Sequence, residues 1–356
     1  MKVNGMPTRG LDENIIDFIN SSDEAKGLRE IFESIKNGNK EELFVGIRNN
    51  YISIYFKCMG VFKEISFVVN NGKVNFGQVK TAPKYLKPIG KEKADKTLLD
   101  IKGITEIKKG IKEHYKGEYK KEKDYQQKTV LSNNKDVDSK WFCVDLEYQT
   151  SLYGRFDIIA ISKERINGKY RIAIIELKAD ESSIGTSGND IQQWVDAGKI
   201  KIKDLNNWNL ARGSKVTGHF SNFQGFLSDK ESVNTLKEDI IRSIQTYKML
   251  KYGGDCLLDL YSDFDTINIV DDFEELPQIV FLNYAVDKEI STVTKTFKGA
   301  VFSHEYSIKN VWEQKVIDTW SKYYSCLFID CYPRKYNFSK LEISEAKNIF
   351  DEEAYK

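Results

Sequence analysis

The sequence predicts a mixed α/β protein with a small N-terminal α+β domain and a larger second domain. The 356-residue chain exceeds the size of one ordinary hydrophobic core. Short strand-like runs fill much of its first hundred residues, and three longer runs follow between residues 141 and 178. A segment bearing Lys and Pro, residues 82–96, separates the two regions and resembles a linker. We therefore expect domains over residues 1–99 and 100–356.

The N-terminal domain is expected to contain one or two helices within residues 11–37, followed by short strands. The strand candidates are FVGIR, YISIYF, EISFVV and KVNFG. Asn49-Asn50 and the Asn-Asn-Gly at 70–72 supply turn signals between them. This domain could supply substrate choice, self-association as a homo-oligomer, or regulation.

The second domain follows the order α-β-β-β-α-β over residues 104–286. A long helix is expected over 104–131, and a helix-rich stretch that includes LKEDIIRSIQTYKML precedes a last strand, QIVFLNYAV. The three strands between them are WFCVDLEYQ, RFDIIAIS and YRIAIIELK. A Gly- and Ser-rich loop at 180–190 follows the third strand and could close over a substrate.

Composition narrows the class of protein and its location. Hydrophobic residues make up 40% and charged residues 30% of the chain, which fits a globular protein with sizeable cores. No apolar run approaches the roughly 20 residues that span a bilayer, and the first residues lack the layout of a secretory signal. The five cysteines include no CxxC pair, which argues against a disulfide framework or a structural zinc site. We expect a cytoplasmic protein that does not bind membranes.

Three charged residues stand in the apolar strands of one predicted hairpin. Asn167-Gly168 is a strong signal for a two-residue turn, and it would place Asp157 opposite Lys178. Glu176 would then face Ile159 and lie diagonal to Asp157, within roughly 7–8 Å. All three charged side chains would project to one face at the same end of the hairpin.

Two carboxylates at that separation repel each other unless a cation lies between them. Mg²⁺ suits such a site because it binds carboxylate and phosphate oxygens and retains several waters. A lysine beside it could orient the attacking water or stabilise charge that develops on a phosphodiester. The alternative is structural: Asp157 pairs with Lys178, and Glu176 is a solvated charge at a strand end.

These residues resemble the motif of the PD-(D/E)xK nuclease superfamily, which has the restriction-endonuclease-like fold. Asp157 matches the first acid, and Glu176-Leu177-Lys178 match the (D/E)xK triplet, whereas Phe156 replaces the proline of the motif. The resemblance implies an αβββαβ core and Mg²⁺- or Mn²⁺-dependent hydrolysis of nucleic acid. It assigns Asp157 and Glu176 as metal ligands and Lys178 as the residue that assists water. By analogy we expect an endonuclease that acts on DNA rather than RNA.

A further metal ligand has two candidates. Members of the superfamily often add an acid from the first core helix, and Glu118 falls near the centre of the apolar stripe of the helix expected over 104–131. Gly117 could instead end that helix and leave Glu118 solvated. Glu147, on the strand before Asp157, is the rival.

Three further features could contact nucleic acid. His219 lies in the aromatic-rich GHFSNFQGF, which could stack on bases or pack into a core. Gln245, on the predicted helix after Lys178, matches a glutamine that some members of the superfamily use. The lysine-dense residues 107–128 form either a solvated helix face or a phosphate-facing patch, although the net charge is only +1. Two alternatives to a nuclease remain: a nucleic-acid-binding module that does not cut, and a structural, partner-binding protein.

Overall fold

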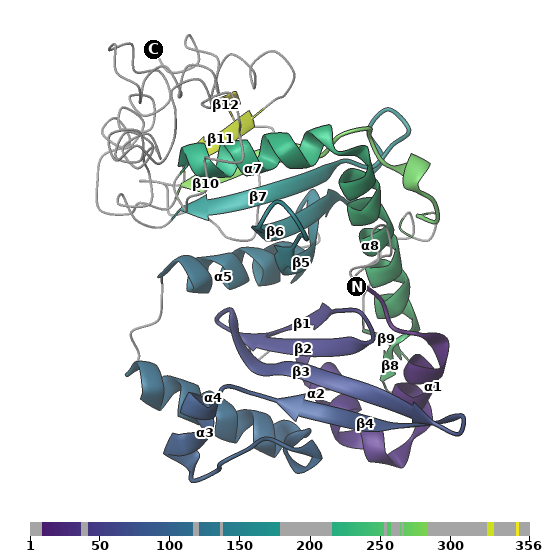
Figure 1. The fold of residues 1–356 in the computed structure, drawn as a ribbon, viewed down its shortest axis with the longest axis vertical. Helices are drawn as coiled ribbons and strands as arrows, with labels where there is room; N and C mark the ends of the chain where they lie inside the picture. The colour runs from purple at the N-terminus through teal and green to yellow at the C-terminus, as the bar shows by residue number, and fades with distance from the viewer. Residues whose placement is uncertain are drawn as a thin grey trace, which may run out of the picture.

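The fold combines a four-stranded and a six-stranded sheet, each flanked by helices (Figure 1). The mixed α/β class expected from the sequence is therefore confirmed. A computed structural model describes residues 9–36, 42–116, 121–135, 138–178, 216–252, 255–257, 264, 267–283, 326–330 and 347–348. In this described part of the chain, no helix is long and apolar enough to cross a membrane.

The first sheet is an antiparallel meander, as the sequence predicts. Its strands are β1 (Leu43–Ile47), β2 (Tyr51–Phe56), β3 (Met59–Asn70) and β4 (Lys73–Lys80). Asn50, Asn71 and Gly72 adopt the positive φ values that their turns require. Helices α1 (Glu13–Ser21) and α2 (Lys26–Lys36) bury aliphatic and aromatic side chains in the same core as this sheet.

The segment over 82–96 is part of this packed unit. It contains α3 (Pro83–Leu86) and two short 3-10 turns, η2 (Lys87–Ile89) and η3 (Lys96–Leu98). Tyr85 and Leu86 are buried in the core that holds the first sheet. The segment therefore contributes core residues and is not a loose tether.

The single helix expected over 104–131 is wrong, because two helices occupy this region. They are α4 (Ile101–Tyr115) and α5 (Lys121–Lys135). Lys116 ends α4 in a left-handed conformation, with φ of 49°. Helix α4 packs with α3 and the first sheet, whereas α5 packs on the second sheet (Figure 1).

The second sheet is mixed, with strand order β12-β11-β10-β7-β6-β5. Its strands are β5 (Trp141–Gln149), β6 (Arg155–Ser162), β7 (Ile172–Lys178), β10 (Gln278–Asn283), β11 (Cys326–Asp330) and β12 (Lys347–Asn348). Strands β5, β6 and β7 are antiparallel neighbours, whereas β10 runs parallel to β7 and β11. A separate two-stranded ribbon joins β8 (Lys251–Tyr252) to β9 (Asp255–Cys256).

Helices cover both faces of the second sheet. Helix α5 packs Val130 with Ile158 and Ile175 on one face. On the other face, α7 (Val216–Ser228) and α8 (Lys230–Met249) pack with Ile159 and Ile174. The strands are therefore apolar on both sides, and a charged residue within them is desolvated.

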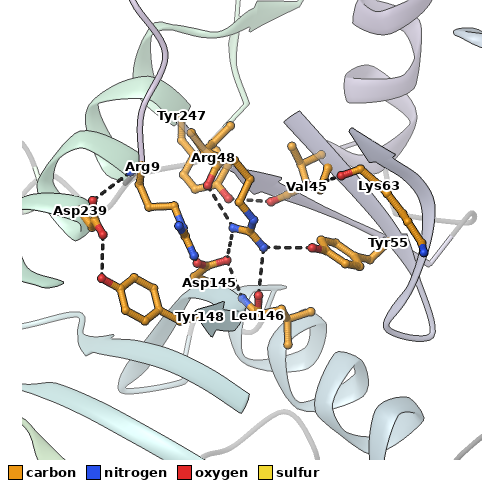
Figure 2. A network of polar contacts seen from close by, with 12 residues as sticks. Arg9, Val45, Arg48, Tyr55, Lys63, Asp145, Leu146, Tyr148, Asp239 and Tyr247 are labelled. Atoms are coloured by element: carbon orange, nitrogen blue, oxygen red, sulfur yellow. Dashed lines mark hydrogen bonds and ion pairs between the residues drawn. The ribbon is translucent and has the colours of Figure 1, made fainter. Parts of the chain in front are cut away.

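A buried ion-pair network joins the N-terminal region to the second sheet (Figure 2). The Asp145 carboxylate of β5 accepts a hydrogen bond from Arg9 Nε at 2.8 Å and another from an Arg48 guanidinium nitrogen at 2.5 Å. Arg48, which follows β1, also donates to Tyr55 Oη and to the Leu146 carbonyl, each at 3.0 Å. Although burial acts in the opposite direction, Asp145 and Tyr55 raise the pKa of Arg48 above its ordinary value.

The same network reaches helix α8. Asp239 accepts the Arg9 backbone amide at 2.9 Å and the Tyr148 hydroxyl at 2.6 Å. Tyr247 donates its hydroxyl to the Val45 carbonyl at 2.6 Å. These bonds connect β1, β5, α8 and the residues before α1 within one buried cluster.

Candidate active site

The predicted hairpin between β6 and β7 is present, with the turn where the sequence places it. Asn167 and Gly168 have φ values of 54° and 82°, as a tight turn of this type requires. Ile166 and Lys169 form an isolated antiparallel bridge beside the turn.

The register farther from the turn differs from the prediction by two residues. Strands β6 and β7 pair Ile158 with Ile175 and Ile161 with Ile172. Asp157 therefore falls opposite Glu176, and the predicted opposition of Asp157 and Lys178 is wrong. The even shift keeps Ile159 and Ile174 on one face, with Ile158 and Ile175 on the other. Phe156 packs in the same cluster as Ile159, so the regular alternation is interrupted beside Asp157.

The cause of the shift is an insertion on the β6 side. Three residues separate Ser162 from Ile166, whereas one residue separates Lys169 from Arg171. The Lys163 amide bonds to the Lys140 carbonyl at 2.9 Å instead of to the partner strand. Ser162 Oγ accepts the Arg171 amide at 3.0 Å and donates to the Glu164 carbonyl at 2.8 Å, which holds the bulge.

Asp157 lies where β6 and β7 cease to pair. Its side chain is buried, with 5% of its surface exposed. Asp157 Oδ2 accepts the backbone amide of Leu177 at 2.9 Å, so the carboxylate occupies the position of a strand carbonyl. The contact fixes one Asp157 oxygen directly beside the (D/E)xK triplet.

Glu176 is also buried, with 2% of its surface exposed, and it contacts helix α7. His219 Nε2 lies 3.1 Å from Glu176 Oε1. The His219 ring packs near Phe223, one turn along α7, with ring centroids 6.1 Å apart. His219 thus belongs to the Glu176 environment, a contact that no spacing in the sequence indicates.

The second candidate acid on β5 has other partners. Glu147 forms ion pairs with Lys123 of α5 and, at 3.1 Å, with Arg155 of β6. Glu147 has a φ of 54°, which interrupts the regular course of β5. These contacts assign Glu147 a local ion-pairing role.

The remaining predicted residues lie apart from this pair or outside the described side chains. Gln245 is exposed on α8, in a hollow lined also by Asp12 and Arg242 near the N-terminal region. Glu118 and the loop over 180–190 lie outside the described residues. The backbone of Lys178 closes β7 beside Asn283 of β10, whereas its side chain is not among those described.

Asp157 and Glu176 supply carboxylate oxygens, the ligand type that Mg²⁺ prefers. Mg²⁺ is commonly held by one or two carboxylates, with water and phosphate oxygens completing its coordination. In the described part of the chain, no group of three or more His, Cys, Asp or Glu side chains is placed to hold a metal.

The comparisons with known proteins add no relative. No protein-family model matches the chain, and neither a curated protein nor a solved structure matches it.

Proposed function

We propose that the protein is a metal-dependent nuclease that hydrolyses phosphodiester bonds, and that it acts as an endonuclease on DNA. The observation that carries the proposal is the pair of buried carboxylates on adjacent strands, Asp157 of β6 and Glu176 of β7. Lys178 follows Glu176 by two residues on β7. Desolvated acids on strands that are apolar on both sides call for a cation or a proton.

The order of the elements supports the same proposal. Helix α5 precedes the antiparallel strands β5, β6 and β7, and α7 and α8 precede β10, which lies parallel to β7. This order agrees with the αβββαβ arrangement of the restriction-endonuclease-like fold, which we propose for the second sheet and its helices.

Each residue has a separate proposed role. Asp157 and Glu176 would hold Mg²⁺ or Mn²⁺ through their carboxylate oxygens. When bound, such a cation neutralises charge on the phosphodiester and favours ionisation of a water. Lys178 would orient that water or stabilise the charge that develops on the phosphate oxygens. His219, 3.1 Å from Glu176, would hold this carboxylate in one orientation.

A second candidate function is nucleic-acid binding without cleavage. The specific observation that favours it is that protein groups already contact both acids. Leu177 donates its amide to Asp157, and His219 lies beside Glu176. On this alternative the two acids stabilise the hairpin and activate no water.

A cleavage assay separates the two functions. Wild-type protein is incubated with Mg²⁺ or Mn²⁺ and with plasmid, linear duplex, single-stranded DNA and RNA, beside Lys178→Ala. Lys230→Ala, at an exposed position on α8, is the matched control. We expect cleavage of DNA by the wild type and the control, and none by Lys178→Ala. Equal activity in all three proteins would contradict the assigned role, and binding without cleavage would favour the second function.

A further inference from the structure

Lysine side chains from three separate elements gather along one strip of the surface. We define this basic strip as Lys57, Lys108, Lys112, Lys128 and Lys135. Lys108 and Lys112 lie on α4, Lys128 and Lys135 on α5, and Lys57 at the tip of the β2–β3 hairpin. Figure 1 shows α4 and α5 on the same side of the molecule.

The buried ring of Phe56 marks one end of the strip. Three lysine ammonium groups approach it: Lys108 at 4.9 Å, Lys57 at 5.7 Å and Lys112 at 5.8 Å from the ring centroid. Lys108 and Lys112 stand one turn apart, so they share a face of α4. The aromatic ring holds several cations close together although they repel one another.

A cavity of about 180 Å³ marks the other end of the strip. Its lining includes three lysines and two acids: Lys57, Lys128, Lys135, Asp124 and Glu42. Asp124 is shared, because Lys57 contacts one of its oxygens at 2.8 Å and Lys128 the other at 2.7 Å. Burial lowers the pKa of Lys135, although Glu42 acts in the opposite direction. A bound anion would stabilise the charged form of this partly desolvated ammonium group.

The hairpin tip connects the strip to the candidate active site. Next to Lys57, Cys58 is buried, and Gln127 of α5 accepts its amide at 2.5 Å. Burial is the main cause that raises the pKa of the Cys58 thiol, and the charges of Glu147 and Asp157 add to it. Cys58 also packs in one buried cluster with Ile158 and Leu177, which are the chain neighbours of Asp157 and Glu176.

We propose that the basic strip binds the phosphodiester backbone of the nucleic-acid strand that is cut at Asp157 and Glu176. This inference rests on the proposed nuclease function. The strip extends across two helices and a hairpin tip, which suits consecutive phosphates of a polymer better than a single small anion. The lysine-dense stretch of the sequence is thus a phosphate-facing patch in part, with Lys108, Lys112 and Lys128 as the residues involved.

Binding without cleavage tests the strip on its own. A fluorescently labelled DNA strand and its duplex are titrated with full-length protein in EDTA, and the anisotropy is recorded over a series of salt concentrations. Lys108→Ala/Lys135→Ala removes a charge from each end of the strip and leaves the Asp124 ion pairs intact. Lys230→Ala/Lys251→Ala changes the net charge equally at exposed positions elsewhere and is the matched control. Thermal melts confirm that each variant is folded.

We expect the strip variant to bind DNA at least about tenfold more weakly than the control. Its slope of log K against log salt should be shallower by about 1.4 for a single strand and about 1.8 for a duplex, the release expected for two lost phosphate contacts. Lys108→Arg/Lys135→Arg should restore binding. Affinity and slope equal to those of the control would overturn the inference, as would complete competition by inorganic phosphate at matched ionic strength.

The two proposals fail separately. If the strip variant binds DNA like the control while the wild type cleaves DNA, the nuclease function is retained and the DNA-binding role of the basic strip is rejected. If the wild type binds through the strip but cleaves no polymer with Mg²⁺ or Mn²⁺, the strip stands as a nucleic-acid site and the nuclease function fails.

Discussion

Two aspartates in neighbouring strands show that a buried charge in an apolar strand has more than one explanation. Asp145 of β5 is neutralised by Arg9 and Arg48 and joins separate parts of the fold. Asp157 of β6 instead accepts the backbone amide of Leu177, the residue that follows Glu176 in β7. Asp157 is recognisable in the sequence because a second acid and a lysine follow it at suitable spacing. Asp145 carries the same desolvation signal, but its arginine partners lie far from it in the sequence.

Removing the Asp157 carboxylate should destabilise the hairpin. Asp157→Ala leaves the buried Leu177 amide without its acceptor. We expect the free energy of unfolding to fall by about 1–3 kcal/mol, measured by urea denaturation without divalent cations. Asp157→Asn keeps an acceptor oxygen and should lose less. An Asp157→Ala protein as stable as the wild type would contradict this hydrogen bond.

Removing the Asp145 carboxylate should lower the free energy of unfolding more than removing that of Asp157, because two buried guanidinium groups lose their counter-ion. We expect Asp145→Ala to lower the free energy of unfolding by about 3–5 kcal/mol in the same assay. Glu64→Ala is the control, since Glu64 and Lys80 form a more exposed ion pair. Its loss should not exceed about 1 kcal/mol. Similar small losses in both variants would show that the network contributes little to stability.

At the scale of single elements, the start of helix α8 depends on one carboxylate. Asp229 accepts the amides of Glu231 and Ser232 at 3.1 and 3.3 Å, and the hydroxyls of Ser232 and Tyr153 at 2.7 and 3.0 Å. Burial acts to raise the pKa of Asp229. The hydrogen bonds from Ser232 and Tyr153 outweigh it and hold this pKa below its ordinary value. The ionised form is therefore the one that caps the helix.

This cap gives a prediction for pH dependence. Because the pKa of Asp229 is lower in the folded state, its contribution is complete above the ordinary value of about 3.9 and is lost as the pH falls through the folded value. Asp229→Ala should reduce the free energy of unfolding by about 0.5–2 kcal/mol at neutral pH. The difference between wild type and Asp229→Ala should narrow in urea titrations below about pH 4. A difference that stays constant with pH would rule out the cap as its source.

Elements with local signals could be predicted from the sequence, whereas features set by distant partners could not. The Asn167-Gly168 turn needs only its own two residues, and it was predicted. The bulge that shifts β6 depends on the carbonyl of Lys140, the residue before β5, so the register prediction was wrong. The Lys57-Cys58 turn is a similar case: both residues adopt positive φ, at about 1–2 kcal/mol each, without the usual Asn or Gly. Gln127 and Asp124 of α5 hold that turn from outside.

At the scale of the whole molecule, one hydrophobic cluster extends from the first sheet to the second. It includes Phe32 of α2, Ile54 of β2, Ile159 of β6 and Ile244 of α8. Together with the Arg9–Arg48–Asp145 network, this continuity links the stability of the N-terminal region to that of the second sheet. The Lys and Pro content of residues 82–96 predicted a linker there, and so a separation between two domains. The burial of Tyr85 and Leu86 in the common core could not be predicted from that composition.

Damage to the N-terminal core should therefore spread to the second sheet. Phe32→Ala should cost about 3–5 kcal/mol, since Phe32 is fully buried. Hydrogen exchange should then accelerate in β5 and β6 as well as in β1–β4. Faster exchange confined to β1–β4 would indicate two independent folding units.

Direct measurement of divalent cation binding tests the central claim, that Asp157 and Glu176 form one metal site. Mn²⁺ is titrated calorimetrically into the wild type, Glu176→Gln, and Glu231→Gln, a control that removes an exposed carboxylate of α8. We predict one Mn²⁺ site in the wild type and the control, and an affinity at least about tenfold weaker in Glu176→Gln. Equal affinity in all three proteins, or no binding by the wild type, would contradict the claim.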